Sequence, residues 1–196
     1  RAGEPTISEL SGNDLPSVDL APATSALAVD TGNSHTCALL DTAQARCWGD
    51  HDSGQTGGID LPRVDLGTGR TAQALGLGYL HSCAILNGGD IKCWGRNVSG
   101  QSGVGNTTYY GYGMNGEPIG DELPVVDAGT AASAVQVSGG WEHTCALFSD
   151  GSVRCWGSGA RLGLGSNLDI GTITTGGGSL GDEPGEMGSN LPVVQL

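Results

Sequence analysis

The chain has 196 residues, 36 of them glycine, and a formal net charge of −13 at pH 7. A surface this acidic repels phosphate backbones, which argues against nucleic acid as a partner and indicates a strongly solvated surface or one that binds cations. No apolar run approaches the ~20 residues of a membrane span. Only 15% of the residues are charged and short apolar runs recur between glycines, so we expect an all-β protein with almost no helix.

Two apolar segments recur in a fixed order along the chain. A Leu-Pro hexapeptide with alternating apolar residues predicts a short strand that tolerates proline near its start. A second apolar strand follows, and a glycine (Gly32, Gly78 or Gly140) then marks a tight bend or a bulge. The hexapeptides occupy residues 15–20, 61–66, 123–128 and 191–196, and the second strands residues 26–29, 72–75 and 134–137.

A hairpin with two cysteines, ten positions apart, follows each of these glycines. It reads His-x-Cys-Ala, a short turn, and then Cys-Trp-Gly. In the third copy the turn 149–151 ends in glycine, a standard three-residue hairpin connection that places Cys145 directly opposite Cys155. The second copy has the same kind of turn, whereas the turn 41–43 of the first copy lacks glycine and can differ. All six cysteines lie in these copies, as Cys37 and Cys47, Cys83 and Cys93, and Cys145 and Cys155.

The two cysteines of each copy are predicted to form a disulfide across the hairpin. Directly opposed residues of an antiparallel pair lie within disulfide reach. Paired disulfides imply an oxidising compartment, and we expect the protein to be secreted or at the cell surface. Zinc coordination and free thiols are the alternatives, but zinc sites usually place two cysteines closer together or near a pair of histidines.

Strand alternation sorts the hairpin residues onto two faces. In the third copy one face carries His143, Cys145 and Cys155, and the other carries Thr144 and Trp156. A blade packed between two neighbours buries both faces, which accounts for apolar residues at odd and even positions alike.

The order of these motifs resembles the regulator-of-chromosome-condensation repeat, in particular the cysteine-containing, secreted bacterial-type branch of that family. The resemblance covers residues 15–196, with the closest match between Val137 and Gly165. It implies propeller-type blades of short antiparallel strands around an axis. Family propellers commonly close with seven blades, so three disulfide-stapled blades leave a single chain open.

We expect one repeat array over residues 1–196, with a leading segment at 1–20 and repeats at 21–66, 67–128 and 129–196. The chain begins at Arg1, as a mature, processed or excised segment does. Its last Leu-Pro strand is expected to start a fourth unit without partners, and such an edge invites pairing with another chain. Either the chain is a fragment of a longer propeller, or blades of several copies join head to tail in a ring or a filament.

Histidine and tryptophan recur beside the cysteines. The histidines are expected to bond the backbone near the bend, with a ring of metal ligands or a pH sensor as the alternative. The tryptophans are expected to pack between blades, and ligand stacking is the alternative. The residues concerned are His35, His81 and His143, and Trp48, Trp94 and Trp156.

Other aromatic residues are the candidates for partner contacts. Tyr79 and Trp141 occupy equivalent positions beside the bend, where the first copy has Asn33. Three tyrosines in the long loop of the second repeat form a candidate patch for protein or glycan contact. These tyrosines are Tyr109, Tyr110 and Tyr112.

Acidic residues gather in the long loops. Four of them are candidate calcium ligands, because calcium takes six to eight oxygen ligands, but their spacing matches no standard calcium loop and a solvated acidic rim is the alternative. These are Asp121, Glu122, Asp182 and Glu183. No other cofactor is expected. Asn97 and Asn106 match the N-glycosylation acceptor, which matters only if the source glycosylates secreted proteins.

No residues have the pattern of a catalytic site, so we expect no enzymatic activity. The first hypothesis is an extracellular structural or adhesive repeat protein whose blades assemble with further copies of itself or with further blades of the same protein. The second is a secreted protein-binding module or enzyme inhibitor that uses propeller-face loops to bind an extracellular protein or glycan. Guanine-nucleotide exchange with chromatin binding, the role of the family's best-known member, is disfavoured by the charge and the paired cysteines.

Overall fold

A computed structural model describes residues 17–20, 22–58, 63–111, 118–164 and 178–195. Its strands form three antiparallel sheets, which we call blades 1, 2 and 3. Blade 1 contains β1 (Ala26–Thr31), β2 (His35–Leu40) and β3 (Ala45–Gly49); blade 2 contains β4 (Ala72–Leu77), β5 (His81–Leu86) and β6 (Ile91–Gly95); blade 3 contains β7 (Ala134–Gly139), β8 (His143–Phe148), β9 (Val153–Ser158) and β10 (Ser179–Leu180).

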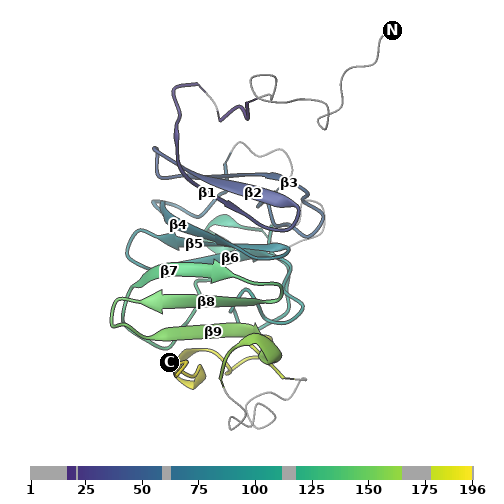
Figure 1. The fold of residues 1–196 in the computed structure, drawn as a ribbon, viewed down its shortest axis with the longest axis vertical. Helices are drawn as coiled ribbons and strands as arrows, with labels where there is room; N and C mark the ends of the chain where they lie inside the picture. Colours follow the sequence, from purple (N-terminus) through teal and green to yellow (C-terminus); the bar gives the residue numbers. More distant parts are fainter. Residues whose placement is uncertain (1–16, 21, 59–62, 112–117, 165–177, 196) are drawn as a thin grey trace.

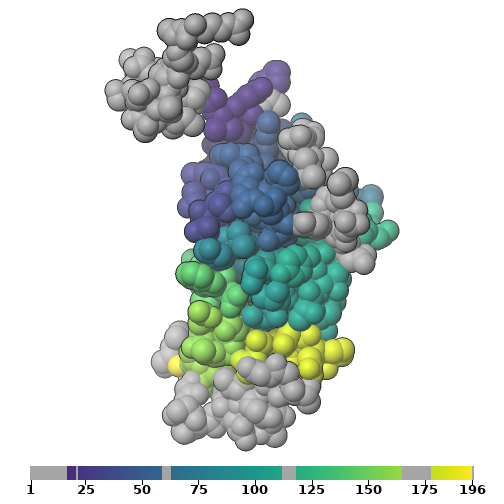
Figure 2. Space-filling model, turned by 90° about the vertical axis from the view of Figure 1, so that its right-hand side faces the viewer, coloured from purple at the N-terminus to yellow at the C-terminus, as the bar shows by residue number. Residues whose placement is uncertain are grey.

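The blades stack face to face along the long axis of the molecule, in chain order (Figure 1). The same order is visible on the surface, where the C-terminal segment (yellow) lies against the teal segment that follows blade 2 and next to blade 3 (Figure 2). Short 3-10 helices at Gly120–Glu122, Gly159–Arg161 and Gly188–Asn190 lie in the connections. None of the helices in the described ranges is long and apolar enough to cross a membrane. The predicted all-β fold of open, disulfide-bonded blades is confirmed.

Each hairpin has the predicted register. Cys37 lies opposite Cys47, Cys83 opposite Cys93, and Cys145 opposite Cys155, and each pair forms a disulfide. The first hairpin keeps this register without the glycine, because Ala43 adopts the left-handed conformation (φ 57°) that Gly151 adopts in blade 3 (φ 84°). The three disulfides indicate an oxidising compartment.

Removing the disulfide of the middle blade should lower the free energy of unfolding by about 2.5–3 kcal/mol, the chain-entropy value for a loop of roughly eleven residues. The variant Cys83→Ala/Cys93→Ala tests this by urea unfolding. Wild-type protein treated with a reductant should shift in the same direction and further, because it loses all three disulfides. An unchanged midpoint for the variant would contradict the prediction.

The Leu-Pro hexapeptides differ from the prediction. None forms a strand in the described part of the chain, and the last three attach to the outer strand of the blade that precedes them. The amides of Val64, Val126 and Val194 donate to the carbonyls of Ala45, Ile91 and Val153, each at 2.9 Å. Proline removes a backbone donor two residues earlier, so a single bond forms in place of a ladder. The last hexapeptide is therefore bonded to blade 3.

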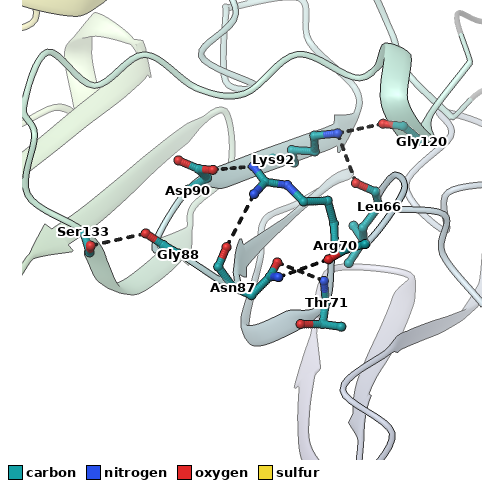
Figure 3. Close-up of polar contacts among 10 residues, drawn as sticks. Leu66, Arg70, Thr71, Asn87, Gly88, Asp90, Lys92, Gly120 and Ser133 are labelled. Atoms are coloured by element: carbon teal, nitrogen blue, oxygen red, sulfur yellow. Dashed lines mark hydrogen bonds and ion pairs between the residues drawn. The ribbon is translucent and has the colours of Figure 1, made fainter.

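The basic residue before the second cysteine, Lys92 in blade 2 and Arg154 in blade 3, donates hydrogen bonds to the backbone of these Leu-Pro segments. The buried Lys92 ammonium donates to the carbonyls of Leu66 (3.0 Å) and Gly120 (2.7 Å), and burial lowers its pKa (Figure 3). Arg154 donates to the Leu191 carbonyl at 2.5 Å in the same way. Figure 3 also shows Arg70 paired with Asp90 beside Lys92. Lys92 and Arg154 thus bind backbone carbonyls of the connections between blades.

The hydrophobic core lies between the blades. In each blade one surface, which we call the His face, carries the histidine and the disulfide. The opposite surface, the Trp face, carries the hydroxyl residue next to the histidine and the tryptophan. One buried cluster joins the His face of blade 1 to the Trp face of blade 2, and a second joins the His face of blade 2 to the Trp face of blade 3. The predicted packing of Trp94 and Trp156 between blades is confirmed, since both are fully buried.

Candidate interface formed by the blade junctions and the outer faces

The junction between blades 2 and 3 contains a buried polar node. His81 Nε2 lies 2.9 Å from the Thr144 hydroxyl, which donates to the Gln101 carbonyl at 2.8 Å. The Trp156 indole N–H donates to the same carbonyl at 3.0 Å. The His face of blade 2 thus supplies His81 and the Gln101 carbonyl, and the Trp face of blade 3 supplies Thr144 and Trp156.

The junction between blades 1 and 2 repeats this node. His35 Nε2 lies 2.8 Å from the Ser82 hydroxyl, which donates to the Gln55 carbonyl at 2.8 Å. The Trp94 indole N–H donates to that carbonyl at 3.0 Å. The histidines therefore contact side chains of the next blade, whereas the sequence had predicted backbone contacts near the bend.

The network determines which nitrogen carries the proton. A hydroxyl has one proton to donate, and in Ser82 and Thr144 that proton goes to the backbone carbonyl of a glutamine. Each hydroxyl must therefore accept its second hydrogen bond from the Nε2–H of a neutral histidine. The Nδ1 atoms of His35 and His81 are buried without a partner. Burial is the main cause that lowers the pKa of His35 to about 4 and of His81 to about 3. Protonation would place a second, unpaired donor inside the junction.

The glycine before each histidine allows the ring to pack closely. A Cβ atom on Gly32 or Gly78 would lie 2.2 or 2.0 Å from the Cε1 atom of His35 or His81. None of these glycines needs the left-handed conformation, and the bulges lie in the inner strands, between Ala72 and Ala74 in blade 2. The predicted bend is present directly after each glycine, and close packing against the histidine is the reason that glycine is required there.

Two faces of the stack have no neighbouring blade within the described residues. On the His face of blade 3, Cys145, Leu147 and Val153 are half-buried, whereas the corresponding residues of blade 2 are fully buried. On the Trp face of blade 1, Trp48 is half-buried and Val29 is 63% exposed, although Ala38 stays buried. Val137, the counterpart of Val29 in blade 3, is only 5% exposed.

The bends beside the glycines form a ladder along the inner strands. The Asn33 amide donates to the Tyr79 carbonyl (3.2 Å), and the Tyr79 amide donates to the Gly140 carbonyl (2.9 Å). The Tyr79 ring stacks on Trp141 with 4.3 Å between centroids. Trp141 ends the ladder and is 56% exposed. All of these residues line an open cavity of about 360 Å³ together with Thr31 and Leu77.

The predicted tyrosine patch is not brought together with this ladder. Tyr110 is buried and pairs with Gly95 through an isolated bridge. Tyr109 is half-buried, and Tyr112 lies outside the described residues. Of the predicted contact residues, only Tyr79 and Trp141 share a site.

The acidic candidates for calcium have other partners or do not converge. The Asp121 carboxylate accepts from the amide and the hydroxyl of Thr68, both at 2.7 Å, and these bonds lower its pKa. Asp182 and Glu183 donate their amides to Glu186, a buried carboxylate whose pKa burial raises. Among the described residues no three His, Cys, Asp or Glu side chains form a metal-binding group.

The side chain of Asn97, a predicted glycosylation acceptor, is fully buried and hydrogen-bonded within the fold. It donates to the carbonyls of Asn106 (2.7 Å) and Thr108 (3.1 Å), and accepts from the Ser102 amide (2.8 Å). A glycan on Asn97 is incompatible with this fold.

The sequence analysis missed Ser82, Thr144, Gln55 and Gln101, although a signal was present. A hydroxyl residue separates the histidine from the first cysteine in every repeat, at Thr36 in the first, and a Gly-Gln pair follows two of the hairpins. Because these residues recur in the repeats, they are expected to have a structural role. The hydrogen bonds between the hydroxyls and the glutamine backbone join different repeats, however, and sequence spacing does not show them.

Comparison with solved structures supports this architecture. Human WBSCR16 aligns over 88% of this chain and 40% of its own, at 18% identity and a TM-score of 0.61. Yeast RCC1 (Prp20), in a structure bound to Kap60, aligns over 87% of this chain and 37% of its own, at 19% identity and a TM-score of 0.57. The chain thus spans less than half the length of these proteins, and the likeness concerns the fold. A search of curated protein sequences finds no significant match.

The sequence profile of the regulator of chromosome condensation (RCC1) repeat matches three segments, residues 27–55, 73–101 and 134–161. Each segment runs from the inner strand of one blade to the loop that follows its outer strand. The three matched segments correspond to the three blades and include the residues of the two polar nodes. The chain therefore contains three RCC1 repeats, one for each blade.

Proposed function

We propose that this chain is a non-enzymatic structural repeat protein of an extracellular compartment, and that its outer faces dock on further RCC1-type blades, such as those of a second copy. The observation that carries the proposal is the contrast between blade 2, which buries both faces, and the two outer faces, which leave the same positions uncovered. A junction between copies would bury Val29 and Leu147 as the internal junctions bury Val137 and Ile85.

Such a contact joins two different faces of the same chain. A head-to-tail contact forms a ring if its rotation closes and a filament if it does not. In the first case the copies complete a propeller, and in the second they extend the stack seen in Figure 1. The disulfides support a location outside the reducing cytosol.

Val29→Asp should abolish association of the chain, because it places a charge in the centre of the Trp face of blade 1. The matched control is Leu27→Asp, two residues away on the same strand. Leu27 is 68% exposed, but its counterpart Gln73 is exposed even in the middle blade, so this position faces solvent in every repeat. Sedimentation velocity of both variants and the wild type over a concentration series measures the effect.

A wild-type chain that stays a 19.7 kDa monomer at all concentrations would refute the proposal. A mixing experiment adds a second test. Leu147→Asp disables the His face of blade 3, and Val29→Asp disables the Trp face of blade 1. Neither variant should associate alone, whereas an equimolar mixture should form a 1:1 dimer through the two intact faces.

The exposed Trp141 supports a second candidate function, a secreted protein-binding module. The cavity beside Tyr79 and Trp141 offers an aromatic surface next to the Asn33 side chain. A partner captured from extracellular fluid with 1:1 stoichiometry by the wild type, and lost with Trp141→Ala, would favour this function over assembly.

A further inference from the structure

We infer that the two outer faces recognise each other through the histidine–hydroxyl contact of the internal junctions, with His143 of one copy donating to the Thr36 hydroxyl of the next. The inference rests on the proposed assembly and names its partner, the Trp face of blade 1 in a second copy. Each outer face already holds one half of this contact.

The half on blade 1 consists of Thr36 and Trp48. Thr36 lies opposite Trp48 across β2 and β3, as Ser82 lies opposite Trp94 and Thr144 opposite Trp156. In the internal junctions these hydroxyl and indole groups bond to the preceding blade. Neither the Thr36 hydroxyl nor the Trp48 indole forms such a bond within the described chain.

The half on blade 3 is His143, which is held in the orientation of its counterparts. The Gly140 amide donates to the His143 carbonyl at 2.8 Å, as the Gly78 amide does to His81. A Cβ on Gly140 would lie 2.0 Å from His143 Cε1, as a Cβ on Gly78 would from His81 Cε1. Nδ1 of His143 is buried without a partner, and no described residue bonds its Nε2. The edge that meets a hydroxyl in the other two repeats is thus open.

The hydrogen bonds between the bends all run in one direction along the stack, and this direction agrees with that of the histidine–hydroxyl contacts. The amides of Asn33 and Tyr79 each donate to a carbonyl in the bend of the following blade. The Trp141 amide has no acceptor within the described residues, and one ring face is covered by Tyr79. A second copy in the same register would bring the bend that contains Asn33 to Trp141. Both contacts therefore require the same head-to-tail order.

One part of the internal node is changed on blade 3. The loop after its hairpin is two residues shorter, and Arg161 stands where the other repeats have Gln55 and Gln101. Arg161 and Arg96 both approach Glu142, at 3.7 and 3.5 Å. The acceptor in the internal nodes is a backbone carbonyl, which Arg161 also has, so the junction between copies still depends on the contact of His143.

This dependence makes docking sensitive to acid. The charged residues near His143 are Arg161 and Glu142 of its own repeat, together with Arg96 from the loop after blade 2. On the partner face, Thr36 and Trp48 are neutral, and Arg46 lies beside them. Burial, and then the charge of Arg161, already lower the pKa of His143. Docking would bury the ring further, so affinity should fall by about tenfold per pH unit below the pKa of the undocked residue.

The test uses the pair that forms a single junction, Val29→Asp mixed with Leu147→Asp. We expect the Kd of this pair to rise as the pH falls from 7.5 to 5.0, because protonation of His143 opposes docking. Adding Thr36→Val to the Leu147→Asp chain should weaken binding about five- to tenfold at pH 7.5. Adding His143→Gln to the Val29→Asp chain should leave a Kd that no longer changes with pH.

The two substitutions together should weaken binding no more than the stronger of them alone, because both act on one shared contact. Thr42→Val and His51→Gln are the controls, since both side chains are exposed away from the outer faces. Additive effects, or binding that strengthens in acid as the net negative charge falls, would overturn the inference and leave the assembly standing. A pair that does not associate at pH 7.5 would overturn both.

Discussion

Lowering the pH from 8 to 5 is expected to destabilise the folded chain by about 4 kcal/mol through two buried histidines. The folded-state pKa values of His35 (about 4) and His81 (about 3) lie below the ordinary value of 6.5. The unfolded chain therefore binds protons first as the pH falls. The stability due to the neutral rings is complete above pH 6.5 and is lost progressively down to pH 4 or 3, about 2 kcal/mol for each histidine at pH 5.

Urea unfolding at half-unit pH intervals measures this loss. The window between pH 6.5 and 5 separates the histidines from Asp50, Asp121 and Asp150, whose lowered pKa values affect stability only in stronger acid. His81→Gln keeps a donor for Thr144 and should remove about half of the pH dependence, while the exposed His51→Gln should remove none. Equal slopes for the two variants would contradict the assignment of the effect to the junction.

Gly78→Ala is expected to destabilise the chain by roughly 3 kcal/mol or more, although it adds only one methyl group. The new Cβ would lie 2.0 Å from His81 Cε1 and 2.6 Å from the Gly140 carbonyl oxygen, so both the node and the bend ladder must shift. Overpacking of a rigid core typically costs about 1–3 kcal/mol, and the disturbed hydrogen bonds add to this. In thermal unfolding the Tm should fall by about 2–4 °C per kcal/mol.

Gly151→Ala is the matched control for this substitution. Nothing lies within 4 Å of a Cβ at Gly151, and its φ of 84° imposes only backbone strain. The first repeat already tolerates alanine in this conformation at Ala43, so we expect a loss of only about 1 kcal/mol. If both alanines cost the same, close packing against the histidine is not the reason for glycine at position 78.

The hairpins were predictable because every contact that defines them is local. Cys145 pairs with Cys155 across a turn whose residues are contiguous, and the turn length alone determines the register. The sequence did not show that Ala43 can take the place of glycine in the turn of the first hairpin. Only the structure shows that this hairpin keeps the same register. The Leu-Pro segments were wrongly predicted to be strands, because each forms a single bond to an outer strand roughly 20–40 residues earlier, for example from Val194 to Val153.

The candidate interface was predictable only in part. Trp141 was recognised as an exposed aromatic residue, but its stacking on Tyr79 joins residues 62 positions apart. The separate tyrosine patch was predicted to be exposed, whereas Tyr110 is buried. The partners of the histidines lie in other repeats, 47 positions away for His35 and 63 for His81. Each repeat shows what it contributes to a junction but not what it meets there.

The sequence by itself determined the unit of this protein: a disulfide-bonded hairpin with a histidine on one face and a tryptophan on the other, repeated three times. Local turn geometry and strand alternation are sufficient for that result. Only the tertiary structure decided how the units join, because the node between His81 and Thr144 depends on the stacking of two blades. It also showed that the last Leu-Pro segment closes the outer edge of blade 3, so the uncovered surfaces are the faces of the stack.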